Sequence, residues 1–217
     1  MKTNIVFAIT LFFISSCSTL AFWSDDSEEE NSEPAKLFKI QNKYPIEIEW
    51  RRSLDGENDF GSFVPSFYSG EMIIADPKGN LLSINPINGK TIWDMNLKRD
   101  LSAGTASGFG KIIVSDANGF VIAIDSVTKE TLWEKNIGGE VLSNGVISAS
   151  LVLLKNSVGE LVALDSATGE QKWSFRSQLP ALTVRGTGEP IIENGTVFST
   201  FDNGRLGAFQ LDTGYFL

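Results

Sequence analysis

The side chains that most often carry out chemistry in proteins are scarce in this sequence. Its 217 residues include no histidine and a single cysteine, Cys17. Nucleophilic sites of the Ser-His-Asp and Cys-His kinds are therefore excluded, as are histidine-ligated zinc and the commonest general base. Carboxylates, lysine, tyrosine and backbone groups remain available for catalysis. Because a single cysteine cannot form a disulfide within the chain, the role of Cys17 depends on its surroundings.

Cys17 follows a short leader. Lys2 supplies a positive start, residues 5–14 (IVFAITLFFI) are apolar, and ISSC (14–17) ends the run with small residues. This run is too short to span a bilayer, and its flanks are typical of a secretory signal. The stretch resembles a bacterial lipoprotein signal, which implies that residues 1–16 are a signal peptide and that Cys17 becomes the lipidated, palmitate-bearing first residue. Ser18 replaces the aspartate common in inner-membrane lipoproteins, which implies the outer membrane. The alternative is an ordinary signal cleaved at the small residues.

The residues after Cys17 are acidic and lack periodicity. Six carboxylates occur between positions 25 and 33 with no base among them, and the whole chain has a net charge of −9. Because such a composition favours disorder, we predict a lipidated, disordered tether over residues 17–40 and a folded domain over 41–217. The negative charge also argues against a nucleic-acid partner, since it would not neutralise a phosphate backbone.

Tryptophan recurs at a nearly fixed interval. Trp50, Trp93, Trp133 and Trp173 are separated by 43, 40 and 40 residues. In the second unit, KIIVSD (111–116) leads through Asn-Gly to the alternating run FVIAID (120–125), and a turn then leads to TLWEKN (131–136). This pattern predicts strands joined by tight turns, and SAGTA (102–106) is expected as a weak first strand. Four-stranded units of about 40 residues predict an all-β fold, a β-propeller rather than a sandwich.

The recurrent residues have structural interpretations. Three tryptophans are expected to pack their rings on neighbouring blades: Trp93, Trp133 and Trp173. Four aspartates recur at turns, where aspartate bonds the backbone two residues on: Asp76, Asp116, Asp125 and Asp165. They form no D-x-D-x-D-G loop, so no metal site is predicted. Lys129 stands where other copies have Gly89 and Gly169, and we expect this departure to change the second unit's turn slightly.

The repeat carries a family resemblance. GELVALDSATGEQKW (159–173) matches G-x-[LV]-x-A-[LI]-D-x-x-T-G-x-x-x-W, which is similar to the tryptophan-docking repeat of pyrroloquinoline-quinone-type propellers. Together with the leader and the acidic tether, residues 182–209 resemble the propeller lipoprotein of the outer-membrane β-barrel assembly machinery. The resemblance implies a non-catalytic scaffold without a cofactor, anchored by lipid to the outer membrane and facing the periplasm. The implied partners are the central barrel-forming subunit and unfolded outer-membrane proteins.

An insertion between the third and fourth repeats supplies the candidate binding residues. The spacing there grows by five, and the extra length contains LPALTVRGTGEP (179–190). Apolar residues beside an arginine are the composition expected of a protein-contact loop. In the resembling family the matching loop is part of the surface that binds the central barrel-forming subunit, which makes Leu182, Val184 and Arg185 the contact candidates. The alternative is a plain surface loop whose arginine is solvated.

The chain holds fewer repeats than a closed ring of this family, which has about eight blades. A fourth copy, GRLGAFQLDTG (204–214), is followed by three residues, and IEIEWRRSLDG (46–56) resembles an outermost strand without a blade of its own. We therefore expect a partial propeller of about four blades, with repeats ending near Trp93, Trp133, Trp173 and Leu217. The two interpretations are a fragment of a longer protein and two chains that pair into a full ring.

Two other functions stay open. A quinone-cofactor dehydrogenase of the same superfamily would need a cofactor and calcium in the central channel and commonly a vicinal cysteine pair, whereas this sequence has one cysteine. A ligand-binding propeller lipoprotein with no role in assembly is the other possibility, because a shared fold does not confer a function. Co-purification with the assembly machinery would distinguish it from the scaffold.

Overall fold

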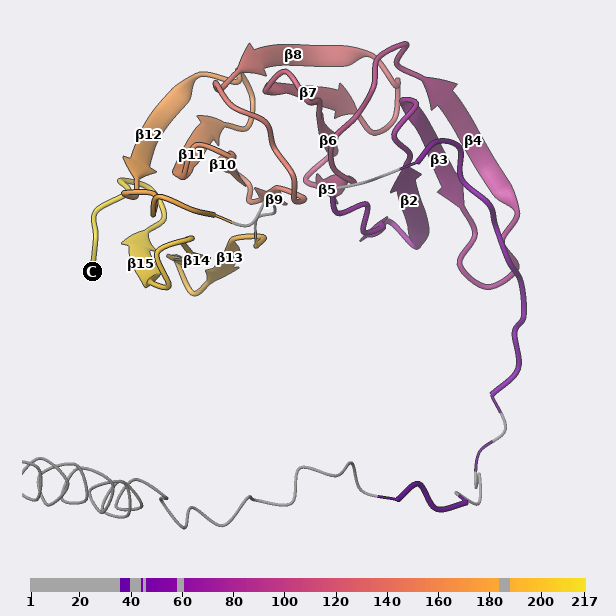
Figure 1. Ribbon diagram of the computed structural model, residues 1–217. Coiled ribbons are helices and arrows are strands. Elements are labelled where there is room, and N and C mark those ends of the chain that lie inside the picture. The colour runs from indigo at the N-terminus through magenta and orange to yellow at the C-terminus, as the bar shows by residue number, and fades with distance from the viewer. Residues whose placement is uncertain (1–35, 40–43, 45, 58–60, 184–187) are drawn as a thin grey trace, which may run out of the picture. The chain divides into compact units, whose positions relative to one another are not determined.

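The computed structural model describes residues 36–39, 44, 46–57, 61–183 and 188–217. The chain divides into two compact units, residues 1–46 and 47–217. The described residues of the first unit form no helix or strand, whereas those of the second form fifteen strands and no helix (Figure 1). No helix in the described ranges is long and apolar enough to cross a membrane. The predicted leader, Cys17 and nearly all of the predicted tether lie outside the described residues.

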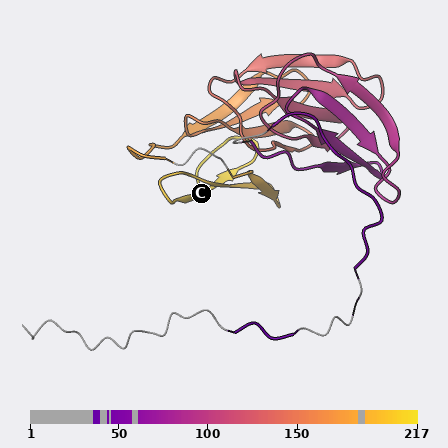
Figure 2. The ribbon, with the colours of Figure 1, turned by 45° about the vertical axis from the view of Figure 1, so that its right-hand side comes forward.

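The strands form four antiparallel sheets, and each sheet takes its strands in chain order. The first contains β1 (Ser66–Tyr68), β2 (Glu71–Ala75), β3 (Asn80–Ile84) and β4 (Thr91–Asn96). The second contains β5 (Ala106–Gly108), β6 (Lys111–Ser115), β7 (Phe120–Asp125) and β8 (Thr131–Asn136). The third contains β9 (Val146–Ile147), β10 (Leu151–Lys155), β11 (Glu160–Asp165) and β12 (Gln171–Arg176). The fourth has three strands, β13 (Ile191–Glu193), β14 (Thr196–Thr200) and β15 (Leu206–Gln210). Within residues 47–217 the sheets follow one another along an arc (Figures 1 and 2).

The predicted first strand of the second sheet was placed too early. We expected it at 102–106, but β5 covers Ala106–Gly108. The preceding residues bond elsewhere: the Ser102 hydroxyl donates to the Val141 carbonyl at 2.6 Å, and the Gly104 amide donates to the Ser62 carbonyl at 2.8 Å. These residues connect the inner ends of neighbouring sheets, so they are unavailable for pairing with β6.

The turns between the third and fourth strands are built by aspartate and glycine. In the third sheet the Asp165 carboxylate accepts hydrogen bonds from the amides of Ala167 and Thr168 at 2.9 and 3.0 Å. The bond from Ala167, then those from the Lys172 ammonium and Thr168, hold the pKa of Asp165 below its ordinary value. Gly169 closes the turn at φ 74°, a conformation that favours glycine. The turn reverses the chain so that β12 pairs with β11.

Apolar side chains from facing sheets form three core clusters, one at each junction. Between the second and third sheets, Ile113 and Ala123 meet Val152 and Leu164, all nearly inaccessible to solvent. Equivalent clusters join the first sheet to the second and the third to the fourth. The second and third sheets thus bury one face against the preceding sheet and the other against the following one, which explains why their inner strands are apolar on both faces.

Tryptophan side chains fasten each sheet to the next. Trp133 on β8 lies against Gly169, where a Cβ atom would come within 2.7 Å of the indole ring. Its Nε1 donates a hydrogen bond of 3.0 Å to the Ser166 carbonyl in the same turn. Glycine is therefore required at this turn for contact as well as for backbone conformation. The same arrangement recurs for Trp50 with Gly89 and the Pro86 carbonyl, and for Trp173 with Gly214 and the Leu211 carbonyl.

Trp93 is the exception, because its turn carries Lys129 in place of glycine. Lys129 keeps the glycine-like backbone at φ 65°, and its ammonium lies 4.0 Å from the centre of the Trp93 ring. That ammonium donates to the Ser126 carbonyl, the group equivalent to those that accept the other indoles. The Trp93 Nε1 donates instead to Glu71 at 3.2 Å. The expected change in the turn was wrong, since the turn is retained and the tryptophan contact changes.

Candidate functional site

The loop predicted to contact a partner connects β12 to β13. Its described part covers residues 177–183 and 188–190, and the Leu182 side chain is 91% exposed. Val184 and Arg185 lie outside the described residues. Leu179, on the same loop, is 37% exposed and lies over Gly159, where a Cβ atom would come within 2.8 Å of its side chain. One leucine therefore holds the loop to the third sheet while the other points into solvent.

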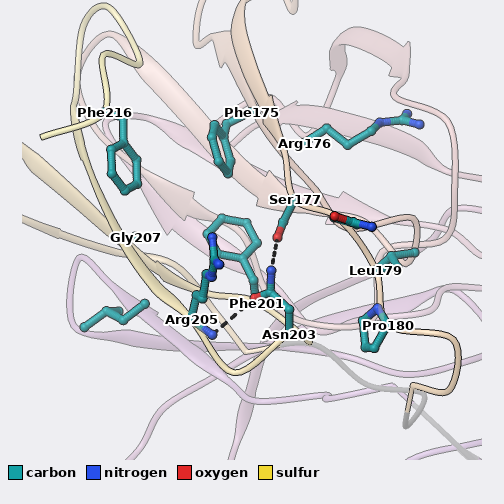
Figure 3. Close-up of a pocket in the computed structure, with 12 residues that line it drawn as sticks. Phe175, Arg176, Ser177, Leu179, Pro180, Phe201, Asn203, Arg205, Gly207 and Phe216 are labelled. Carbon is teal, nitrogen blue, oxygen red and sulfur yellow. Dashed lines mark hydrogen bonds between the residues drawn. The ribbon is translucent and has the colours of Figure 1, made fainter.

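A cavity of about 400 Å³ lies beside this loop, at the junction of the third and fourth sheets. Phe175, Phe201 and Phe216 line one side, and Leu179 and Pro180 from the loop line another (Figure 3). The Phe175 ring lies 5.4 Å from the Phe201 ring and 6.0 Å from the Phe216 ring, measured between centroids. These distances are those of packed aromatic rings, so the apolar wall is preformed.

Polar groups line the remainder of the cavity. The Asn203 amide donates to the Ser177 hydroxyl at 2.9 Å and joins the loop to the β14–β15 turn. Arg176 is paired with Glu160 at 3.1 Å. The Arg205 guanidinium pairs with no carboxylate in the part of the chain that the structure describes. The cavity thus combines an aromatic wall with one unpaired cation at its edge.

A buried lysine lies close to this cavity. The Lys155 ammonium donates to the Thr200 carbonyl at 2.8 Å and lies 4.0 Å from Asp202 and 5.8 Å from the Phe201 ring centroid. Burial lowers the pKa of Lys155 below its ordinary value, and the Asp202 carboxylate partly opposes this effect. On the loop, burial raises the pKa of Glu189. Neither group lines the cavity, so both act on the stability of this junction rather than as ligands.

The geometry is suited to binding and not to a chemical step. The cavity offers apolar surface, an amide, hydroxyls and guanidinium groups, which together fit an apolar side chain near a carboxylate. Across the described ranges, no three His, Cys, Asp or Glu side chains are close enough together to hold a metal ion. A protein segment with an apolar anchor and a neighbouring acidic residue is the ligand that matches these groups.

The sequence did not indicate the residues of this cavity. Its aromatic wall is assembled from β12, the β14–β15 turn and the residues after β15, which are widely separated along the chain. Phe175 follows Trp173 by two residues and so shares its face of the strand. That alternation is the one local signal that could have pointed to it. The repeat-packing tryptophans lie elsewhere, with Trp133 and Trp173 buried in the junctions.

Comparison with known proteins places the chain. The family model described as outer membrane protein assembly factor BamB matches residues 48–217. This chain belongs to the BamB family. The BamB of Kangiella koreensis is 46% identical over 190 residues, which cover 87% of this chain and 49% of the relative. The BamB of Aliivibrio fischeri is 45% identical over 197 residues, which cover 88% of this chain and 51% of the relative. The chain therefore spans about half the length of these BamB relatives.

Solved structures show the same fold. The crystal structure of BamB from Moraxella catarrhalis matches with a TM-score of 0.65 and 22% identity, covering 71% of this chain and 47% of that one. A quinohemoprotein alcohol dehydrogenase from Pseudomonas putida HK5 matches with a TM-score of 0.59 and 17% identity, covering 74% of this chain and 34% of that one. The predicted propeller fold and the predicted family are confirmed. The likeness to the dehydrogenase is one of fold alone.

Proposed function

We propose that this chain is a non-catalytic, lipid-anchored scaffold of the outer-membrane β-barrel assembly complex, which helps to deliver and insert outer-membrane proteins. The observation that carries the proposal is the BamB family match over residues 48–217. The two BamB relatives, each more than 40% identical, are named as outer membrane protein assembly factors. The exposed Leu182 beside an apolar cavity supports binding as the mode of action.

The anchor in this proposal is Cys17. The apolar run and the ISSC box that precede it support lipidation, and Ser18 supports sorting to the outer membrane with the domain facing the periplasm. Two or more acyl chains hold a protein on a membrane stably, whereas one holds it weakly. Replacing Cys17 with alanine is expected to remove the protein from the outer-membrane fraction. The mass of the N-terminal peptide from the unsubstituted protein is expected to include the acyl chains.

The partner surface in this proposal consists of Leu182, Val184 and Arg185 together with the cavity beside them. It contacts the central barrel-forming subunit, and unfolded outer-membrane proteins are the clients of the complex. An apolar anchor and an arginine are residue types suited to a protein interface, where a few such side chains carry most of the binding energy. The near-complete exposure of Leu182 leaves it free to enter a partner's pocket without loss of packing in its own fold.

Co-purification with the central barrel-forming subunit tests this surface. Leu182→Ala is expected to weaken binding by about 2 kcal/mol, about 30-fold, as for a truncated interface anchor. Arg185→Glu is expected to weaken it at least as much, because the charge is reversed. Leu132→Ala is the matched control, since Leu132 is 46% exposed on β8, away from the loop. Wild-type retention by both loop variants would contradict the proposed surface, and equal losses in the control would show a general destabilisation.

A further inference from the structure

The fourth sheet lacks the cover that the other three have. In the third sheet, the cross-strand row Val146, Leu153, Ala163 and Trp173 faces the fourth sheet. Directly opposed residues share one face of a sheet. The equivalent row of the fourth sheet is Ile191, Phe198 and Ala208. Ile191 is 61% exposed and the neighbouring Leu206 is 65% exposed, whereas Leu153 is 0% exposed. A face that is buried in the other sheets is open here.

The outer edge of the fourth sheet is also open. In the first three sheets an outer strand pairs with the third strand and places a tryptophan opposite Ser83, Ala123 or Ala163. On the corresponding side of β15, the only bridge among the described residues joins Phe209 to Phe216. The edge of β15 from Gly207 to Leu206 therefore presents unpaired backbone groups, which is a template for another strand.

The same chain contains a segment with the opposite deficiency. Residues 47–52 carry Trp50, whose indole donates to the Pro86 carbonyl at 3.0 Å and lies against Gly89, as the outer-strand tryptophans do in the following sheets. Yet this segment pairs with no strand in the part of the chain that the structure describes. It is an outer strand without three inner strands, and the fourth sheet is three inner strands without an outer strand.

The exposed face of the fourth sheet matches the face that begins the arc. Ile112, Val114, Ile122 and Ile124 of the second sheet receive the first sheet. Their equivalents in the first sheet, by strand register, are Met72, Ile74, Leu82 and Ile84. These four residues face away from the second sheet. The first sheet therefore offers the receiving surface, and the fourth sheet offers the surface that such a face receives elsewhere in the fold.

We propose that two copies of this polypeptide join head to tail, with the fourth sheet of each copy packed on the first sheet of the other. The segment around Trp50 of one copy then completes the fourth sheet of its partner, with Trp50 opposite Ala208, Arg51 opposite Gly207 and Arg52 opposite Leu206. Two such joints close a ring with twofold symmetry, so neither copy keeps an open edge. The chain corresponds to 47% of the solved BamB propeller from Moraxella catarrhalis, so two copies supply about one such propeller. This inference rests on the fold and is independent of the proposed function.

Native mass measurement and disulfide trapping test the joint. The full chain is used with Cys17→Ala, so that engineered cysteines are its only thiols, and is purified in detergent. We expect twice the mass of one chain. Arg52→Cys and Leu206→Cys in the same chain are expected to form a disulfide between copies, visible as a doubled mass that reductant abolishes. Arg52→Cys with Ile87→Cys is the matched control, because Ile87 is 81% exposed but away from β15. It is expected to form no such bond.

A surface substitution separates the joint from general folding. Ile191→Glu buries a charge in the proposed joint and is expected to raise the dissociation constant of the pair at least about 30-fold. Leu132→Glu, on the outer face of β8 and 46% exposed, is expected to leave it unchanged. A single-chain mass at every concentration overturns the proposal, whether the open face is bare or covered by another protein. A doubled mass without the Arg52–Leu206 crosslink, or one unaffected by Ile191→Glu, overturns it as well, as do open-ended assemblies.

Discussion

Replacing Lys129 with glycine is expected to stabilise the protein, because Lys129 occupies the site where a tryptophan docks at the other junctions. Lys129 has φ 65°, and a residue with a Cβ pays roughly 1–2 kcal/mol for this conformation. Glycine removes that strain but adds about 0.5–1 kcal/mol of backbone entropy to the unfolded chain. The backbone effect alone therefore favours glycine by a few tenths to about 1 kcal/mol.

The side-chain effect is expected to add to this gain. With Lys129 removed, the Ser126 carbonyl is free to accept the Trp93 indole, as the Ser166 carbonyl accepts that of Trp133. One such hydrogen bond contributes about 1 kcal/mol. Trp93, which is half-buried, would also bury its ring against the turn. The lost contact between the ammonium and the ring offsets about 0.5–1 kcal/mol. The sum is a stabilisation of about 1 kcal/mol, or roughly 2–4 °C in Tm for a domain of this size.

Urea unfolding with tryptophan fluorescence is the assay, compared between the original chain and Lys129→Gly. We expect a higher midpoint, an unchanged slope and a blue shift in the folded-state emission as Trp93 becomes buried. Lys129→Met is the control, because it removes the ammonium while keeping the strained backbone and the blocked site, and it is expected to lower stability. A lower midpoint for Lys129→Gly would refute the reasoning, since it would show that the ammonium stabilises this junction more than indole docking does.

Two further predictions concern the other junctions. Gly169→Ala is expected to cost at least about 3 kcal/mol, because its Cβ would lie 2.7 Å from the Trp133 ring and the contact adds to backbone strain. Gly195→Ala has the same φ of 74° with no atom within 4 Å, so its cost is expected to be the strain alone, about 1–2 kcal/mol; equal losses in urea unfolding would contradict the contact argument. Lys155→Met is expected to stabilise the chain by about 1 kcal/mol at neutral pH, because a buried charge is removed. Since burial lowers the folded-state pKa of Lys155 below 10.5, the unfolded chain binds more protons between the folded pKa and 10.5, and stability is expected to rise with pH in that window. Lys155→Met is expected to reduce this rise, and an unchanged pH profile would contradict the assignment.

The repeat pattern was sufficient to predict the sheets but not their irregularities. Asp-x-x-Thr-Gly encodes a turn within a few residues, so the strand boundaries around Asp165 and Gly169 follow from local chemistry. The first strand of the second sheet was misplaced because the bonds that displace it, such as that from Ser102 to Val141, join residues far apart in sequence. The consequence of Lys129 was misjudged for the same reason, since its effect falls on Trp93 in another sheet.

The candidate site was predicted only in part. The insertion and its exposed Leu182 were evident from the break in the repeat spacing. The cavity beside them was not, because Phe175, Phe201 and Phe216 come together only when the third and fourth sheets pack. A local pattern carries no information about which aromatic rings will meet across a junction. The structure therefore adds a preformed aromatic wall to the loop that the sequence indicated.

The docking of each tryptophan on the turn of the following sheet has a consequence for how such a gene can lengthen or shorten. Every repeat brings a ring that fits its successor and a glycine that fits its predecessor, as Trp133 and Gly169 do. An in-frame tandem duplication of one repeat length therefore yields a copy already complementary to both neighbours, wherever its breakpoints fall. A repeat that has lost its glycine, as the one with Lys129 has, leaves the preceding ring without its receptor. Descendants copied from that repeat would inherit a weaker junction, so selection on repeat number and selection on this one turn position are coupled.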